Sequence, residues 1–97
     1  FAPFFSVPQA ATTNGTYVLS RLSGAKMLSI SMVRKMDRKG YTLYISDVLN
    51  DYPGEDKQDA ASYINRVIEK EILRAPEQYL WVHRRFKTRP LGEGSLY

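Results

Sequence analysis

Hydrophobic and polar residues alternate in the middle of this chain, over residues 26–48. Leu28, Ile30 and Met32 are separated by serines, and a second alternating run of similar length follows over residues 41–45. Alternation with a period of two is typical of half-buried strands. A short polar, glycine-containing segment joins the two runs and predicts a turn. The sequence therefore predicts an antiparallel β-hairpin over residues 26–48, with its apolar side facing a core.

The spacing becomes helical over residues 56–75. The apolar residues fall on one stripe, which we expect to be core: Ala60, Ile64, Val67, Ile68, Ile72 and Ala75. The polar residues that the helical period places off the stripe are Asn65, Arg66, Glu69 and Lys70. Asp56 is a candidate N-cap, and Pro76 begins a new short turn. The pattern predicts an amphipathic helix over residues 56–75.

A shorter helix is predicted over residues 11–23. Thr12, Thr13 or Asn14 can cap its start, and Gly24 is well placed to end it. Residues 1–9 are aromatic and punctuated by proline, which predicts an extended segment.

The resulting fold class is α/β, an α+β fragment with helix–β-hairpin–helix order followed by a basic, aromatic tail over residues 76–97. Two strands and two helices rarely form a stable sheet protein alone. We therefore expect residues 1–97 to be one portion of a single domain that continues in a larger sheet. The strongly apolar start without an initiator methionine, at Phe1, favours the same interpretation.

Composition limits the kinds of site and partner that the chain can have. The chain has 97 residues, 43% of them hydrophobic, and no cysteine, which excludes a disulfide framework and a zinc–thiolate site. No apolar run approaches the roughly 20 residues that span a bilayer. Charge is uneven: residues 1–40 carry a balance of +5, residues 41–80 one of −4 and residues 81–97 one of +3. Two basic arms around an acidic middle favour anionic partners.

The C-terminal arm holds the most concentrated chemistry, within "APEQYLWVHRRFKTRP" at residues 75–90. The candidate anion-binding residues are Arg84, Arg85, Lys87 and Arg89, and the aromatic residues that would position them are Trp81, His83 and Phe86. Two interpretations of these cations stay open, one in which they face a substrate and one in which part of them pairs with Glu69 and Glu71.

Three other candidates also have two interpretations. His83 could act in catalysis, although a ring that packs and hydrogen-bonds beside Trp81 is the favoured alternative because the sequence around His83 offers no carboxylate to orient it. Thr12 and Thr13 could hold an anion on free backbone N–H groups at a helix start, although simple capping is the favoured role. No metal-ligand set is present.

The tail motif and the segment "PFFSVPQAATTNGTYVLSRLSGAK" resemble the lipid A late acyltransferase family, the enzymes that add secondary acyl chains to Kdo-lipid A in Gram-negative bacteria. The resemblance covers essentially all 97 residues and corresponds to the C-terminal part of the family. It implies a glycerolipid-acyltransferase fold, a mixed sheet flanked by helices, on the cytoplasmic face of the inner membrane.

The resemblance also implies transfer of a fatty acyl group from acyl carrier protein to a hydroxyl of the lipid A precursor, with no cofactor. Family members use a histidine followed five positions later by Asp or Glu as general base and orienting carboxylate. Here the only histidine is His83, and Thr88 lies five positions on. We therefore expect no catalytic residue in this chain, an inactive polypeptide in isolation, and a catalytic pair in a missing N-terminal half.

Two further interpretations compete with this one. A small basic module could bind nucleic acid along its tail, although the aromatic residues of the tail favour packing. A folded remnant of a larger sheet would expose strand edges and form homo-oligomers.

Overall fold

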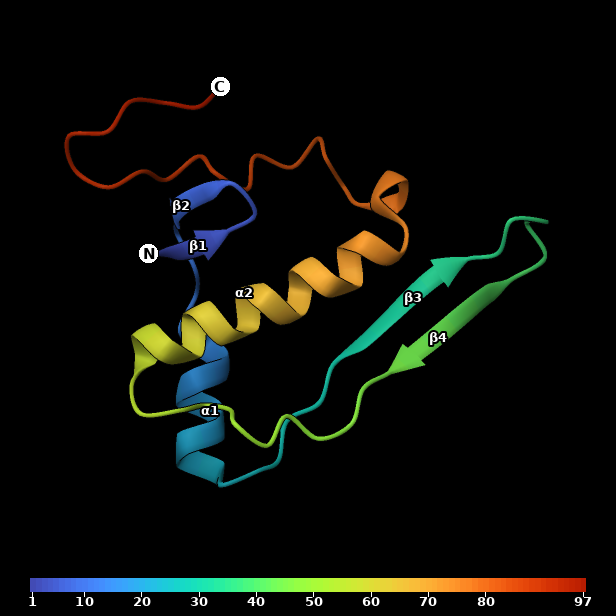
Figure 1. Cartoon of the computed structure of the whole chain (residues 1–97), viewed down its shortest axis with the longest axis horizontal. Helices are drawn as coiled ribbons and strands as arrows, with labels where there is room; N and C mark the ends of the chain where they lie inside the picture. Colours follow the sequence, from blue (N-terminus) through green and yellow to red (C-terminus); the bar gives the residue numbers. More distant parts are fainter.

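The computed structural model describes all of residues 1–97 and is built around one long helix, α2 (Lys57–Arg74) (Figure 1). The strands β1 (Ala2–Phe4) and β2 (Val7–Ala10) lie along one side of α2, and α1 (Gly15–Ser23) crosses near its N-terminal half. The hairpin of β3 (Ile30–Arg34) and β4 (Tyr41–Ile45) extends away from the other side. After a 3₁₀ turn at Pro76–Gln78, the irregular tail passes back over β1 and β2.

The prediction of a helix over residues 56–75 is confirmed to within one residue at each end. The Asp56 side chain accepts a hydrogen bond of 2.8 Å from the backbone N–H of Asp59, which satisfies one of the free donors at the start of the helix. Pro76 begins the next turn, as expected from its missing N–H.

The core against α2 is small and lies at its contact with β1 and β2. Phe4, Ala10 and Ile72 form its centre, and Tyr79 and Phe86 pack against them. Only 10 of the 97 residues are buried, so most of the apolar surface of the chain is uncovered.

The predicted polarity of α2 is wrong at two positions. Asn65 is fully buried, although the helical period placed it off the apolar stripe, while Ile68 of the stripe is 40% exposed. Asn65 is buried because β1 packs against this side of α2, where the Asn65 amide donates to the Pro3 carbonyl.

The N-terminal segment is extended, as predicted, but it folds back on itself. The pairs Ala2↔Ala10 and Phe4↔Val7 make β1 and β2 a short antiparallel hairpin, with Phe5 at φ +51° in its turn. Because β2 occupies residues up to Ala10, α1 begins at Gly15 rather than at residue 11. Its predicted stop is confirmed: Gly24 has φ +66° and donates its N–H to the Ser20 carbonyl.

The hairpin predicted over residues 26–48 is confirmed, with the antiparallel register Ile30↔Ile45, Met32↔Leu43 and Arg34↔Tyr41. The prediction that the apolar side of this hairpin is buried against a core is wrong. The alternating apolar side chains lie on a bare face, where Ile30, Met32 and Ile45 are each 61% exposed and Leu43 is 54% exposed. The serine-bearing face is the one turned toward α2, because Ser29 and Ser31 bind a carboxylate of that helix.

The fold is thus a small mixed α/β arrangement with two separate two-stranded sheets. The single larger sheet expected from the resemblance stays a prediction. None of the helices combines the length and the apolar character that crossing a membrane requires.

Candidate functional site

Two of the candidate residues meet at the junction of three segments. Thr12 follows β2, and its hydroxyl is contacted both by Asn65 of α2 and by Arg85 of the tail. The Asn65 amide donates hydrogen bonds of 3.0 Å to the Pro3 carbonyl and 3.0 Å to Thr12 Oγ1. The Thr12 hydroxyl in turn donates to the Ala10 carbonyl at 3.0 Å. Asn65 therefore joins α2 to both ends of the N-terminal hairpin.

Arg85 completes this junction from the tail. Its guanidinium donates to the Ala11 carbonyl at 2.5 Å and makes a longer contact of 3.4 Å to Thr12 Oγ1. The same group lies 4.8 Å from the centre of the Phe4 ring, a favourable cation–π distance. The Arg85 guanidinium therefore makes a large part of its possible contacts within the fold.

A pocket of about 250 Å³ opens beside the junction. Its polar lining comes from the residues around the α1 start, the segment before α2, α2 itself and the tail: Thr12, Thr13, Asn14, Thr16, Tyr17, Tyr52, Asn65 and Arg85. Burial raises the pKa of the Tyr52 phenol above its ordinary value. The pocket offers hydroxyl and guanidinium donors, which suit an anion or a ligand rich in hydroxyl groups.

Capping at the α1 start is only partly as predicted. Asn14 is the N-cap residue, but its side chain makes no capping hydrogen bond. Thr13 Oγ1 instead accepts from the Gly15 N–H at 3.2 Å. Thr12 points to Asn65 and takes no part in capping.

The remaining tail residues divide into anchored and free ones. Arg89 donates to the Gln9 carbonyl at 2.8 Å and pairs with Glu93, and Phe86 packs on Phe4 with ring centres 5.9 Å apart. Both therefore fix the tail to β1 and β2. Arg84 is exposed and lies 5.5 Å from the Tyr97 ring centre, and the exposed Lys87 makes no side-chain hydrogen bond or ion pair.

Trp81 and His83 do not form the predicted pair. Trp81 donates its indole N–H to the Pro76 carbonyl at 2.6 Å and packs edge-on against Tyr79. His83 is exposed and its ring makes no hydrogen bond, so the hydrogen-bonded ring expected beside Trp81 is not formed. No group of three acidic or histidine side chains converges as a metal site would.

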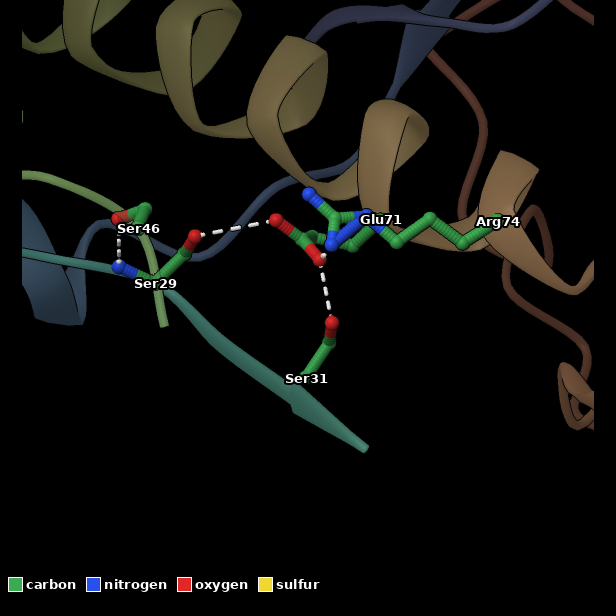
Figure 2. Close-up of polar contacts among 5 residues, drawn as sticks. All are labelled: Ser29, Ser31, Ser46, Glu71 and Arg74. Atoms are coloured by element: carbon green, nitrogen blue, oxygen red, sulfur yellow. Dashed lines mark hydrogen bonds and ion pairs between the residues drawn. The ribbon is translucent and has the colours of Figure 1, made fainter. Parts of the chain in front are cut away.

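The acidic residues of α2 bind other partners than the tail. Glu69 accepts from the Phe5 N–H, and Glu71 accepts from the hydroxyls of Ser29 and Ser31 while Arg74 lies 3.6 Å away (Figure 2). Of the two open interpretations, the one in which part of the tail cations pairs with Glu69 and Glu71 is therefore wrong, since Arg85 and Arg89 donate to backbone carbonyls near β2 instead.

Sequence reasoning missed three residues that organise the molecule: Asn65, Glu71 and Gln78. A signal existed for Asn65, which follows Ala61 by four residues and so shares the face on which a small residue permits close packing. For Glu71 the signal was the pair of serines between apolar residues, whose hydroxyls need a polar partner when a helix covers them. Nothing in the sequence pointed to Gln78.

Comparison with known proteins gives a consistent result. A protein family described as bacterial lipid A biosynthesis acyltransferase matches residues 1–88. The chain is 67% identical over all its 97 residues to a lipid A biosynthesis palmitoleoyltransferase of Escherichia coli K12, and 50% identical to a lauroyltransferase of the same organism. It is 41% identical over 91 residues to a lipid A biosynthesis acyltransferase of Haemophilus influenzae. It spans 31%, 32% and 29% of the lengths of these relatives.

Proposed function

Because the chain belongs to the bacterial lipid A biosynthesis acyltransferase family, we propose that it works as part of a longer enzyme that acylates a Kdo-lipid A precursor. The reaction transfers a fatty acyl group from acyl carrier protein to a hydroxyl of the precursor, at the cytoplasmic face of the inner membrane. The match over residues 1–88 and the identity of 67% to a palmitoleoyltransferase carry this proposal.

Residues 1–97 give the enzyme structural support and positive charge, and they do not supply the groups that transfer a proton. Their only histidine, His83, is exposed and has no carboxylate partner, and Thr88 stands where the family motif needs an acid. The general base and its orienting carboxylate then belong to the part of the enzyme outside this chain.

Within the tail, the contacts separate two roles. Arg85 and Arg89 are held by backbone carbonyls near β2, which favours a structural role. Arg84 and Lys87 are exposed and free of acidic partners, so they are the residues that face an anion, either the phosphates and carboxylates of the acceptor or the acidic carrier protein. Two free cations are few for a nucleic-acid interface, whose affinity grows with each phosphate neutralised.

The proposal is tested by acyl transfer from acyl carrier protein to the lipid A precursor. The longer polypeptide that carries this sequence is expected to be active, and the 97-residue chain alone is expected to give no product above background. Activity of the isolated chain would contradict the assignment of the catalytic pair to another segment.

The division of the tail is tested in the longer enzyme by comparing Arg84→Ala and Lys87→Ala with Arg89→Ala. The first two are expected to raise the KM for acceptor or carrier severalfold while leaving the unfolding temperature unchanged. Arg89→Ala is expected to lower the unfolding temperature instead. Unchanged KM values for both exposed cations would contradict their role in binding anions.

A further inference from the structure

The turn that joins β3 to β4 carries a dense group of positive charges. Residues 34–39, the hairpin tip, hold four cations and one acid, Asp37, a balance of +3. The cations, all exposed, are Arg34, Lys35, Arg38 and Lys39. The ion pairs of the chain lie in α2 and in the tail, so the cations of the hairpin tip have no ion-pair partner.

Hydrogen bonds hold the backbone of the hairpin tip in a defined turn. The Lys35 N–H donates to the Gly40 carbonyl at 2.9 Å, and the Arg38 N–H donates to the Lys35 carbonyl at 3.0 Å. The Asp37 carboxylate accepts from the Lys39 N–H at 2.9 Å. The one acid of the hairpin tip therefore supports the turn, and the cations project from an ordered backbone.

Arg38 has a backbone conformation that favours glycine. Its φ is +60°, in the left-handed region, where the Cβ of any residue other than glycine crowds the backbone. A turn that only reverses the chain would be more stable with glycine or asparagine at this position. Strain of this kind is typical of sites whose side chain has a role beyond folding. The conformation of Arg38 therefore separates the hairpin tip from an ordinary solvated turn.

An apolar side chain lies among these cations. Met36 is 99% exposed. The hairpin tip points away from α2 and from the tail and forms one end of the molecule (Figure 1). A protruding end with one apolar residue among cations suits the surface of an anionic membrane. The cations meet the phosphates of the head groups, and the methionine reaches the apolar layer beneath them.

We propose that the hairpin tip binds an anionic lipid surface through its four cations, with Met36 inserted between the head groups. This inference rests on the proposed function, which places the enzyme at the cytoplasmic face of the inner membrane, and it assigns that contact to residues 34–39. A cluster of about four or more cations is typical of segments that bind anionic lipids.

A folded acidic protein fits the hairpin tip less well. A stable protein–protein interface uses about 20–30 residues on each side, and its centre is closely packed against the partner. The hairpin tip offers only residues 34–39 on a protruding end, with Met36 as its one apolar side chain. A membrane needs no matching shape, because mobile head groups arrange themselves around the cations.

Vesicle flotation tests the proposal without acyl donor or acceptor, so a failure of the proposed reaction would leave its outcome unchanged. The 97-residue chain is expected to bind vesicles that contain phosphatidylglycerol and not vesicles of phosphatidylcholine alone. Lys35→Gln combined with Lys39→Gln is expected to weaken binding roughly twenty-five-fold, at about fivefold for each charge removed. Absence of binding to the anionic vesicles would overturn the proposal.

A matched pair of lysines on α2 controls for net charge. Lys57→Gln combined with Lys70→Gln removes the same charge from exposed positions of α2. This variant is expected to bind within about twofold of the parent, because salt screens charges that lie away from the lipid. Equal weakening in the two double variants would show that binding follows net charge alone and would overturn the hairpin tip as the site.

Arg38→Gly separates a binding role from a structural one. Glycine relieves the strain of the left-handed backbone, so the unfolding temperature is expected to rise. Removal of the cation is expected to weaken binding to the anionic vesicles about fivefold. A variant that binds as tightly as the parent would overturn the assignment of Arg38 as a lipid contact.

Photocrosslinking in the longer enzyme tests whether the hairpin tip meets lipid there. With the enzyme bound to anionic vesicles, a photoreactive amino acid in place of Met36 is expected to form crosslinks to phospholipid. Crosslinks confined to the polypeptide of the enzyme would show that another segment covers the hairpin tip and would overturn the proposal. Crosslinks to added acyl carrier protein in place of lipid would assign the hairpin tip to an acidic protein and overturn the lipid surface as its occupant.

Discussion

Residues of the same type do different work in this chain, and the contacts of each decide which. Arg84 and Arg85 are neighbours in the tail, yet one is exposed and the other donates to the Ala11 carbonyl and lies over Phe4. Sequence identified both as candidates because cations interleaved with aromatic residues are typical of anion sites. It could not separate them, because the partner carbonyls are more than 70 residues away in the chain.

At Arg85 we expect a loss of stability rather than a selective loss of binding. Arg85→Ala removes a charged donor from the Ala11 carbonyl and the ring contact with Phe4, which should cost about 1–3 kcal/mol in urea unfolding. Arg84→Ala, the matched control, should change the free energy of unfolding by less than about 0.5 kcal/mol. Equal effects of the two variants would show that the Arg85 contacts contribute little.

Asn65 is the residue whose replacement should be most informative about the junction. In Asn65→Asp the side chain can no longer donate to the Pro3 carbonyl and Thr12 Oγ1, so three acceptors meet in a buried site. We expect a loss of about 2–3 kcal/mol near neutral pH.

This loss should depend on pH. A buried carboxyl beside acceptors favours its protonated form, so the folded state of Asn65→Asp binds more protons than the unfolded state. The stability of the variant relative to the native chain should therefore be highest at acid pH and fall as pH rises through the titration range of the carboxyl. Urea unfolding at several pH values measures this, and a stability difference that does not change with pH would contradict it.

At the scale of elements, the sequence predicted what depends on local pattern. The bounds of α2 follow from Asp56, Pro76 and a 3.6-residue period, and the end of α1 follows from Gly24. The start of α1 was missed because the residues before it belong to β2, and no local signal in a segment of four residues shows that it will pair with the chain start. The hairpin was predicted, but which of its faces meets α2 depends on what else covers it.

The Asp56 cap gives a direct test of the local contribution to α2. Asp56→Ala removes the acceptor of the Asp59 N–H and should lower stability by about 1 kcal/mol. Asp51→Ala, which removes an equal charge from an exposed position outside the helix, is the control and should have little effect. Circular dichroism during urea unfolding gives both values, and identical midpoints would mean that the cap does not hold the helix start.

In the molecule as a whole, few contacts join the hairpin of β3 and β4 to the rest of the fold. The N-terminal hairpin and the tail share a small apolar core with α2. Two polar bridges join the β3 side of the other hairpin to Glu71 of α2 and to Gln78 of the following turn, and Arg74 of α2 lies over the Tyr44 ring of β4. A mean hydrophobic content of 43% would ordinarily bury more than 10 residues of 97. The sequence has the apolar surface of a larger core, and the bare hairpin face is the part that a two-helix, four-strand arrangement cannot cover.

We expect the polar bridges at Glu71 and Gln78 to set the orientation of the hairpin. Glu71→Ala combined with Gln78→Ala removes the acceptor of Ser29 and Ser31 and the amide that binds Arg34, so the hairpin of the 97-residue chain should lose its fixed orientation on α2. Because the chain has no cysteine, spin labels can be attached uniquely at Met36→Cys, at the 99% exposed hairpin tip, and Lys70→Cys on α2.

The distance distribution between the two labels should be narrow in the parent and broad in the double variant, with the helical signal unchanged. Glu77→Ala, an exposed acidic residue in the same turn as Gln78, is the control and should leave the distribution narrow. A narrow distribution in the double variant would mean that apolar contacts between β3 and α2, rather than the two polar bridges, orient the hairpin.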